Sequence, residues 1–141
     1  MKYSIKAGLA ICFILISGFI WYAFESRSVY GEIRGANKKM PIDHAIYTVY
    51  ENKSEKMTKN EKVAFFLDVF RSFELHEGAL TSVMTTIDDD KDRVFIRNAL
   101  LSQIKKTKRQ KTNRNLVIAW LSTSNQVDFI NSIQTLNRNN E

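Results

Sequence analysis

Residues 58–73 read TKNEKVAFFLDVFRSF, and this stretch predicts the central helix of the fold. Its start matches a capping box. In this motif the Thr58 hydroxyl accepts a hydrogen bond from a free backbone N–H, and the Glu61 side chain reaches back to the backbone N–H of Thr58. Gly78 suits the left-handed residue that ends a helix. Between this start and Gly78, apolar residues recur at helical spacing. They are Val63, Phe66, Leu67, Phe70 and Phe73.

Apolar residues also recur at helical spacing in the segment before this stretch. Pro41 suits a first helical position, and Asp43 places an acid in the first turn. The apolar face of this helix is Ile42, Ala45, Ile46 and Val49. Residues 46–50 are also rich in strand-forming side chains, so a strand remains the alternative there.

Further helices follow the central one. Leu80, Val83, Met84 and Ile87 predict a short third helix, and Asp88, Asp89 and Asp90 are expected to open a fourth by complementing its dipole. The buried positions of that fourth helix are Ile96, Ala99, Leu100 and Ile104, widened by Phe95 and Leu101. The apolar run at 116–121 fits a buried helix or strand, and its helical neighbours favour a helix. Residues 123–126 resemble a second capping box, which predicts a last helix over residues 127–136.

Composition supports one small helical domain. The 141 residues contain a single proline and five glycines, which argues against a turn-rich sheet. Cys12 is the only cysteine, so no disulfide is expected. The predicted fold class is all-α, with an N-terminal transmembrane helix followed by about five to six short helices.

An uncharged segment begins at Ala7 and ends at Phe24, behind Lys2 and Lys6. Its 18 residues would extend about 27 Å as a helix, close to the roughly 30 Å hydrocarbon layer. Trp21 and Tyr22 near its end suit the headgroup level. We therefore expect residues 1–24 to be a membrane anchor, residues 25–40 a juxtamembrane spacer, and residues 41–141 the helical domain.

Two features of this anchor stay open. A cleaved signal peptide is the alternative, although no position along the segment offers two well-placed small residues for cleavage. The sidedness is also divided, because Lys2 and Lys6 favour a cytoplasmic N-terminus while four downstream cations favour the reverse. The sequence favours a protein of the cytoplasmic (inner) membrane with an extracytoplasmic, periplasmic domain.

The candidate binding site is a basic run, with no acidic residue between Asp92 and Asp128. The members of the basic run are Lys105, Lys106, Lys108, Arg109, Lys111 and Arg114. Six cations within ten residues attract an acidic partner. The competing interpretation is a solvated connector whose cations stabilise the end of a helix.

Other clusters give weaker signals. The aspartates 88, 90 and 92 have the spacing that opens a calcium loop, but Arg93 stands where glycine is needed. Helix capping is the better account. His76 lies between two glutamates, and a cation at a helix C-terminus explains it more simply than a metal ligand. No metal, cofactor or catalytic residue is predicted.

These observations favour a membrane-anchored, non-catalytic interaction protein. An inhibitor or immunity-type protein and a subunit of an envelope complex are two versions of this hypothesis. The expected partner is a protein with an acidic face, and nucleic acid is disfavoured because the basic run lacks interleaved aromatic residues. The alternatives are an envelope hydrolase with dispersed carboxylates and a cytoplasmic-facing binder of anionic lipid or nucleic acid.

Overall fold

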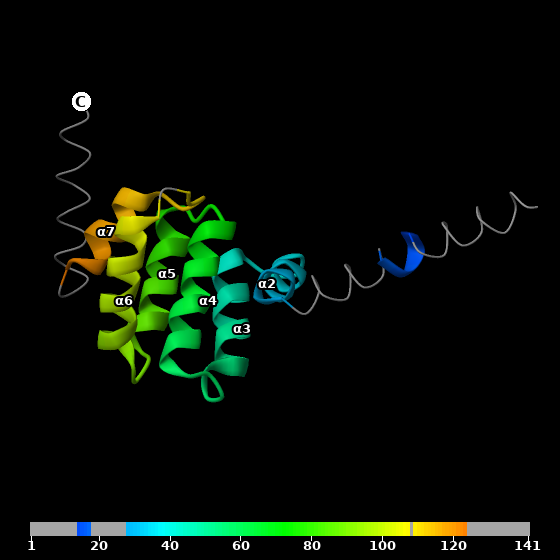
Figure 1. Ribbon diagram of the computed structural model, residues 1–141, viewed down its shortest axis with the longest axis horizontal. Coiled ribbons are helices and arrows are strands. Elements are labelled where there is room, and N and C mark those ends of the chain that lie inside the picture. The colour runs from blue at the N-terminus through cyan, green and yellow to red at the C-terminus, as the bar shows by residue number, and fades with distance from the viewer. Residues whose placement is uncertain (1–13, 18–27, 108, 124–141) are drawn as a thin grey trace, which may run out of the picture.

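The computed structural model describes residues 14–17, 28–107 and 109–123, and all regular structure within them is helical. Six helices follow one another after a short helical turn at residues 14–17 (Figure 1). They are α2 (Val29–Asn37), α3 (Ile42–Ser54), α4 (Lys59–Ser72), α5 (Glu77–Asp88), α6 (Arg93–Lys106) and α7 (Arg114–Leu121). The predicted all-α class is confirmed for these residues. The strand alternative for residues 46–50 is wrong, because they lie inside α3.

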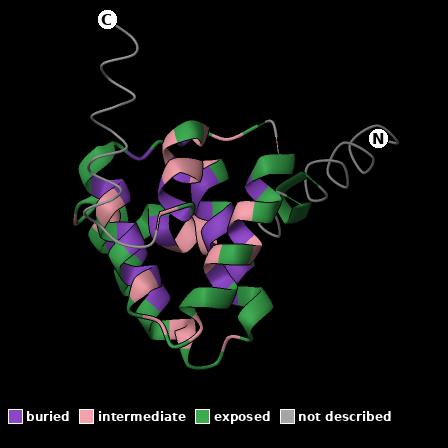
Figure 2. Cartoon of the chain, turned by 90° about the vertical axis from the view of Figure 1, so that its left-hand side faces the viewer, coloured by how far each residue is buried: buried purple, intermediate pink, exposed green. Residues whose placement is uncertain are grey.

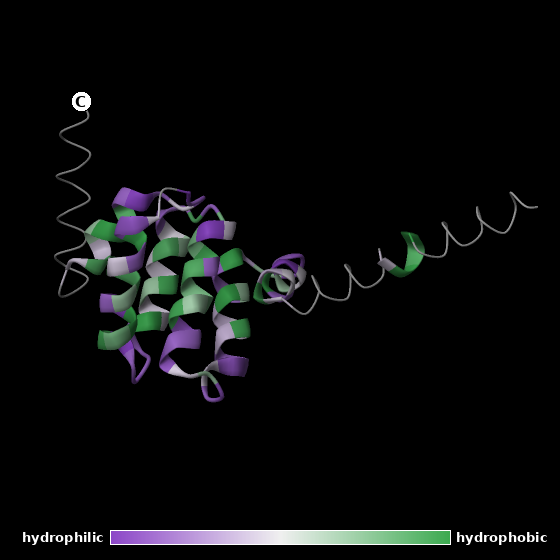
Figure 3. Ribbon diagram, viewed as in Figure 1, coloured by the Kyte–Doolittle hydropathy of each residue, from purple (hydrophilic) through white to green (hydrophobic). Residues whose placement is uncertain are grey.

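The helices form two layers. α3 packs against α5, and α4 packs against α6. Successive helices from α3 to α6 alternate in direction (Figure 1). At one side α2 packs against α3 and α4, and at the other side α7 packs against α6. The connections therefore collect at the two ends of the layers, where hydrophilic residues predominate (Figure 3).

The core lies where the apolar faces of the two layers meet (Figure 2). Several large side chains there have no exposed surface, namely Phe66, Phe70, Leu80, Ile87, Ile96 and Leu100. Burying each of these side chains contributes roughly 2 kcal/mol. Most positions of the predicted apolar faces are buried, but Phe95 is 42% exposed. The positions that are only partly buried are Ile42, Phe73, Ala99 and Leu101.

The predicted capping box is present at the start of α4. The backbone N–H of Glu61 donates to the Thr58 hydroxyl at 3.3 Å, and the backbone N–H of Thr58 donates to the Glu61 carboxylate at 2.7 Å. The Glu61 carboxylate accepts hydrogen bonds from both the backbone N–H and the hydroxyl of Thr58, and these two bonds hold the pKa of Glu61 below its ordinary value. The box fixes where α4 begins and so sets which residues of α4 face the core.

Much of the expected spacer belongs to the folded body, which corrects the prediction for residues 25–40. The Ser28 hydroxyl accepts a hydrogen bond from the N–H of Gly31 at 3.0 Å and starts α2. Ile33 of α2 is fully buried, and Lys53 of α3 pairs with Glu32 at 2.7 Å. Two glycines in this short segment weaken its helical signal, and packing on α3 and α4 compensates for them.

The end of α4 also differs from the prediction. The helix ends at Ser72, with Phe73 in an extended conformation, whereas Gly78 lies in the first turn of α5. The reason is His76, whose Nδ1 accepts a hydrogen bond from the backbone N–H of Ala79 at 3.0 Å. His76 therefore caps the N-terminus of α5, and its assignment as a cation at a helix C-terminus is wrong. No described glycine has a positive φ angle.

The predicted membrane location is corrected by the structure. Among the described residues, no helix is long and apolar enough to cross a bilayer. Only residues 14–17 of the expected anchor are described, and the positions of Ala7, Trp21, Tyr22 and Phe24 lie outside the described residues. The helix predicted over residues 127–136 also lies outside them, whereas the run at 116–121 is confirmed as helical within α7.

The cap at the start of α5 gives a stability prediction. We expect His76→Ala to lower the free energy of unfolding by about 1 kcal/mol, because the N–H of Ala79 loses its acceptor. His76→Asn should retain most of the stability, because its amide oxygen can accept the same hydrogen bond. Chemical denaturation measures both, with His44→Ala as the control, since His44 is exposed and caps no helix. Equal stability of His76→Ala and the native chain would contradict this role.

Candidate functional site

The basic run occupies one end of the two layers, between α6 and α7. Lys105 and Lys106 form the last turn of α6, and Arg109 and Lys111 lie on the connection that follows. All four side chains are exposed, and we call them the basic connection. Lys108 lies outside the described residues, and Arg114 is partly buried at the first position of α7.

The backbone around the basic connection is fixed from two sides. Thr112 is almost fully buried. Its backbone N–H donates to the carbonyl oxygen of Phe70 at 3.1 Å, and its hydroxyl donates to the carbonyl oxygen of Phe73 at 2.7 Å. Arg114 donates to the carbonyl oxygens of Ile104 at 3.2 Å and Lys105 at 2.7 Å. The connection is therefore tied to the ends of both α4 and α6.

Arg114 belongs to a reciprocal pair of arginines that joins α6 and α7. Arg97 of α6 donates to the carbonyl oxygens of Trp120 and Thr123 at the end of α7, and its guanidinium lies 4.7 Å from the centroid of the Trp120 ring. Arg97 also pairs with Asp88 at 2.7 Å. Each helix thus supplies the cation that satisfies the free carbonyl groups of the other. Arg114 therefore stabilises the C-terminal end of α6.

The charge excess of the described region is concentrated in the basic run. Between residues 28 and 123 the chain has 17 basic and 12 acidic residues, and without the run 11 basic residues face 12 acidic ones. Within the described residues, none of the four cations of the basic connection forms an ion pair; the same holds for other exposed lysines, such as Lys38, Lys39 and Lys56, but these do not stand four together on one short segment. The structure therefore presents four uncompensated charges on a fixed backbone.

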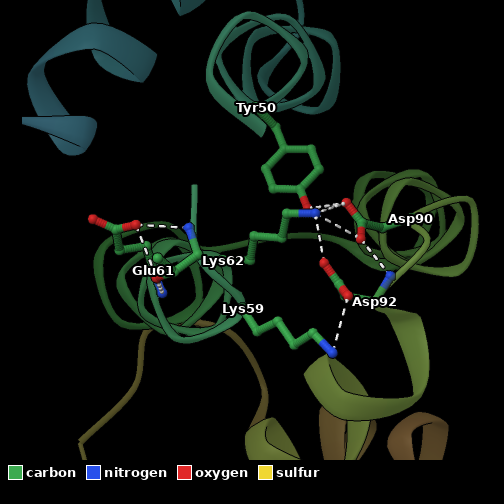
Figure 4. A network of polar contacts seen from close by, with 7 residues as sticks. Tyr50, Lys59, Glu61, Lys62, Asp90 and Asp92 are labelled. Carbon is green, nitrogen blue, oxygen red and sulfur yellow. Dashed lines mark hydrogen bonds and ion pairs between the residues drawn. The ribbon is translucent and has the colours of Figure 1, made fainter. Parts of the chain in front are cut away.

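A second polar cluster at the opposite end of the layers was not found from the sequence. Lys62 is only 1% exposed, and its ammonium donates to both carboxylate oxygens of Asp90 at 2.9 and 2.8 Å and to Asp92 at 3.0 Å (Figure 4). Tyr50 of α3 donates its hydroxyl hydrogen to Asp90 at 2.6 Å. This network, which we call the Lys62 network, joins α3, α4 and the turn between α5 and α6.

Charge pairing governs the pKa values in the Lys62 network. Burial alone would lower the pKa of Lys62, but the hydrogen bonds and negative charges of Asp90 and Asp92 outweigh it and raise the pKa. Burial opposes ionisation of Asp90, yet the bonds from Lys62, Tyr50 and the backbone hold its pKa below the ordinary value. The bond from Lys62 likewise lowers the pKa of Asp92. Burial and Asp90 raise the pKa of Tyr50.

The acidic cluster therefore has a different role from the one predicted. Asp92 precedes α6 but makes no side-chain capping bond to it, and Asp90 instead accepts the N–H of Asp92 at 2.7 Å. One signal in the sequence pointed to this arrangement. Lys62 stands four residues before Phe66 and eight before Phe70, on the apolar face of the central helix, where a lysine requires buried partners.

An open groove adjoins the Lys62 network. A pocket of about 340 Å³ is lined by Lys62, Asp90 and the C-terminal half of α3, and a neighbouring pocket of about 600 Å³ runs between the first half of α3 and α5. His44 lines the larger pocket, whereas His76 caps α5. In the described part of the chain, no three His, Cys, Asp or Glu side chains are arranged to hold a metal ion.

Removing the cation of the Lys62 network should strongly destabilise the fold. We expect Lys62→Met to lower the free energy of unfolding by about 3 kcal/mol, because Asp90 and Asp92 would remain buried without a counter-charge. Adding Asp90→Asn to this variant should recover part of the loss, because one uncompensated carboxylate is removed. Urea denaturation of the single and double variants measures this coupling. Additive losses would show that the three groups do not act together.

The same network predicts acid sensitivity. The pKa values of Asp90 and Asp92 are lowered in the folded chain. Their contribution to the free energy of unfolding is therefore complete above the ordinary carboxyl pKa of 3.8. It is lost as the pH falls below 3.8 toward the folded-state values. Thermal unfolding followed from pH 5 down to pH 2 should show a steeper loss of stability for the native chain than for Asp90→Asn. Parallel curves would count against the pairing.

Comparisons with family models, with curated proteins and with solved structures each found no match for this chain.

Proposed function

We propose that this chain is a non-catalytic protein-binding domain whose basic connection docks against an acidic face of another protein. One observation carries the proposal: four exposed cations without ion-pair partners in the described region stand on a backbone that Thr112 and Arg114 hold in place. Because the backbone is already held in place, only the side chains lose conformational freedom on binding, and the four charges steer a partner of opposite charge toward the surface.

A protein partner fits this surface better than nucleic acid. Residues 105–114 read KKTKRQKTNR and contain no aromatic side chain on which a base could stack. Outside the basic run, the region from residue 28 to residue 123 has no positive excess with which to follow a phosphate backbone. The cationic surface is therefore compact, as is typical of a patch that meets one acidic protein face.

The carboxylates support a binding role over hydrolysis. A hydrolase with two acids needs one carboxyl group that keeps its proton near neutral pH. Asp90 and Asp92 converge on Lys62, which lowers the pKa of both. A lowered pKa favours the ionised carboxylate, which is the opposite of what the proton donor of such a pair needs.

A charge-reversal experiment tests the proposed surface. A fluorescently labelled glutamate-rich peptide serves as the acidic probe, and anisotropy measures its affinity. We expect the triple variant Lys105→Glu, Lys106→Glu, Arg109→Glu to bind the peptide about tenfold or more weakly, because three attractive contacts become repulsive. Affinity for the native chain should fall as the salt concentration rises.

The matched control reverses three other exposed lysines, Lys38, Lys39 and Lys56, which changes the net charge equally. This control variant should bind the peptide within about twofold of the native chain, measured at a salt concentration that screens long-range attraction. Equal loss in both variants would show that net charge alone acts. A duplex DNA of similar charge that binds more tightly than the peptide would overturn the choice of a protein partner.

A further inference from the structure

A long groove runs along the layer formed by α3 and α5. The pockets of about 600 and 340 Å³ share Tyr47, Thr86 and Asp89 as lining residues, so they form one continuous depression. We call it the α3–α5 groove. Its lining on α3 extends from Met40, just before the helix, to Glu55 at its end. That distance corresponds to about 22 Å of helix, much longer than a small molecule.

The floor of the groove suits a closely packed helix. Its residues on α5 are small, and they include Ser82, Thr85 and Thr86. The hydroxyl of Thr85 donates to the carbonyl oxygen of Thr81, and that of Thr86 to Ser82, each at 3.1 Å. Neither threonine therefore requires a polar partner from an occupant. Small side chains along a groove between two helices let a third helix approach closely.

Apolar contact is available in the same groove. Tyr47 lies where the two pockets meet, and its side chain is 52% exposed. Met40 lines one end of the groove and is only partly buried. An exposed tyrosine ring and a methionine are typical anchors for an amphipathic helix, because both offer apolar area with adaptable shape.

The charged residues that line the groove are mostly acidic. Asp43, Glu51, Glu55 and Asp89 form no ion pair within the described residues, and the single unpaired cation among the lining residues is Lys91. Lys62 and Asp90 also line the groove but neutralise one another. An occupant must therefore carry positive charge along its edges.

We infer that the α3–α5 groove binds a basic amphipathic helix of another protein, with the apolar face of that helix against Tyr47 and its cations against Glu51 and Asp89. The mode is the insertion of a helix into a groove, in which anchors recur every three or four residues. This inference is independent of the proposed role of the basic connection, which lies at the end of α6 and carries the opposite charge.

A synthetic peptide of about 15 residues, built from leucine and lysine at helical spacing, is the direct probe. A second peptide with glutamate in place of lysine tests the charge requirement. Anisotropy should show binding of the lysine peptide to the full chain and at least about tenfold weaker binding of the glutamate peptide. The lysine peptide should also gain helical circular dichroism when it binds.

Variants locate the contact. Glu51→Lys with Asp89→Lys should weaken binding of the lysine peptide about tenfold, and Tyr47→Ala should weaken it about fivefold. The matched control, Asp68→Lys with Glu74→Lys, reverses two exposed acids outside the groove and should leave the affinity within about twofold. Circular dichroism of each variant confirms that it is folded. Equal weakening by both charge-reversal pairs would overturn the inference.

Two other occupants give distinct results. If a second copy of this chain fills the groove, sedimentation equilibrium will show a dimer that the Glu51→Lys, Asp89→Lys variant abolishes. If a small organic cation is the natural occupant, spermidine will displace the lysine peptide at a concentration equal to that of the peptide. Either result would overturn the assignment of a helix from another protein. Neither would affect the test of the basic connection, which uses the acidic peptide.

Discussion

The ammonium group of Lys62 is withdrawn from water in the first turn of α4, and its neutralisation constrains how the neighbouring elements can pack. An unpaired ammonium in that position would cost several kcal/mol, so the turn between α5 and α6 must present Asp90 and Asp92 there. Tyr50 donates to the same carboxylate from α3. The ammonium of Lys62 and the hydroxyl of Tyr50 thus find their acceptors in one turn, which ties the positions of α3 and α4 to the turn between α5 and α6.

The other end of α4 is held by a different device. Its last carbonyl groups accept hydrogen bonds from Thr112, so the connection between α6 and α7 is fastened to it. α4 therefore links both ends of the molecule: the Lys62 network at its start and the basic connection at its finish. Because both contacts involve buried groups, neither end can shift without leaving polar atoms unsatisfied. These contacts hold in place the backbone that carries the exposed cations.

The sequence predicted those features that depend on neighbours along the chain. The capping box at Thr58 and the spacing of the apolar residues follow from helix geometry, which is local. The predictions failed where a distant residue decides the structure. Asp90 looks like a helix cap until Lys62 is brought beside it, and α2 forms because Ile33 finds a place on α3 and α4. The position of Lys62 on an apolar face was the available signal, but its partners could not be named from spacing alone.

The same pairing decides which charges remain for binding. Of the four aspartates in residues 88–92, Asp88 is engaged by Arg97, and Asp90 and Asp92 are engaged by Lys62. Asp89 alone of the four faces the α3–α5 groove without an ion pair to any described residue, and Asp43, Glu51 and Glu55 add to its charge there. At the end of the molecule where α6 finishes, Arg114 donates hydrogen bonds to carbonyl groups of α6, and the four cations of the basic connection stay exposed. A sequence with nearly balanced charge outside the basic run thus acquires two surfaces of opposite sign, because the fold neutralises some charges internally and leaves others uncompensated. Opposite signs on separate surfaces allow two different partners to be selected by charge, each excluded from the site of the other by repulsion.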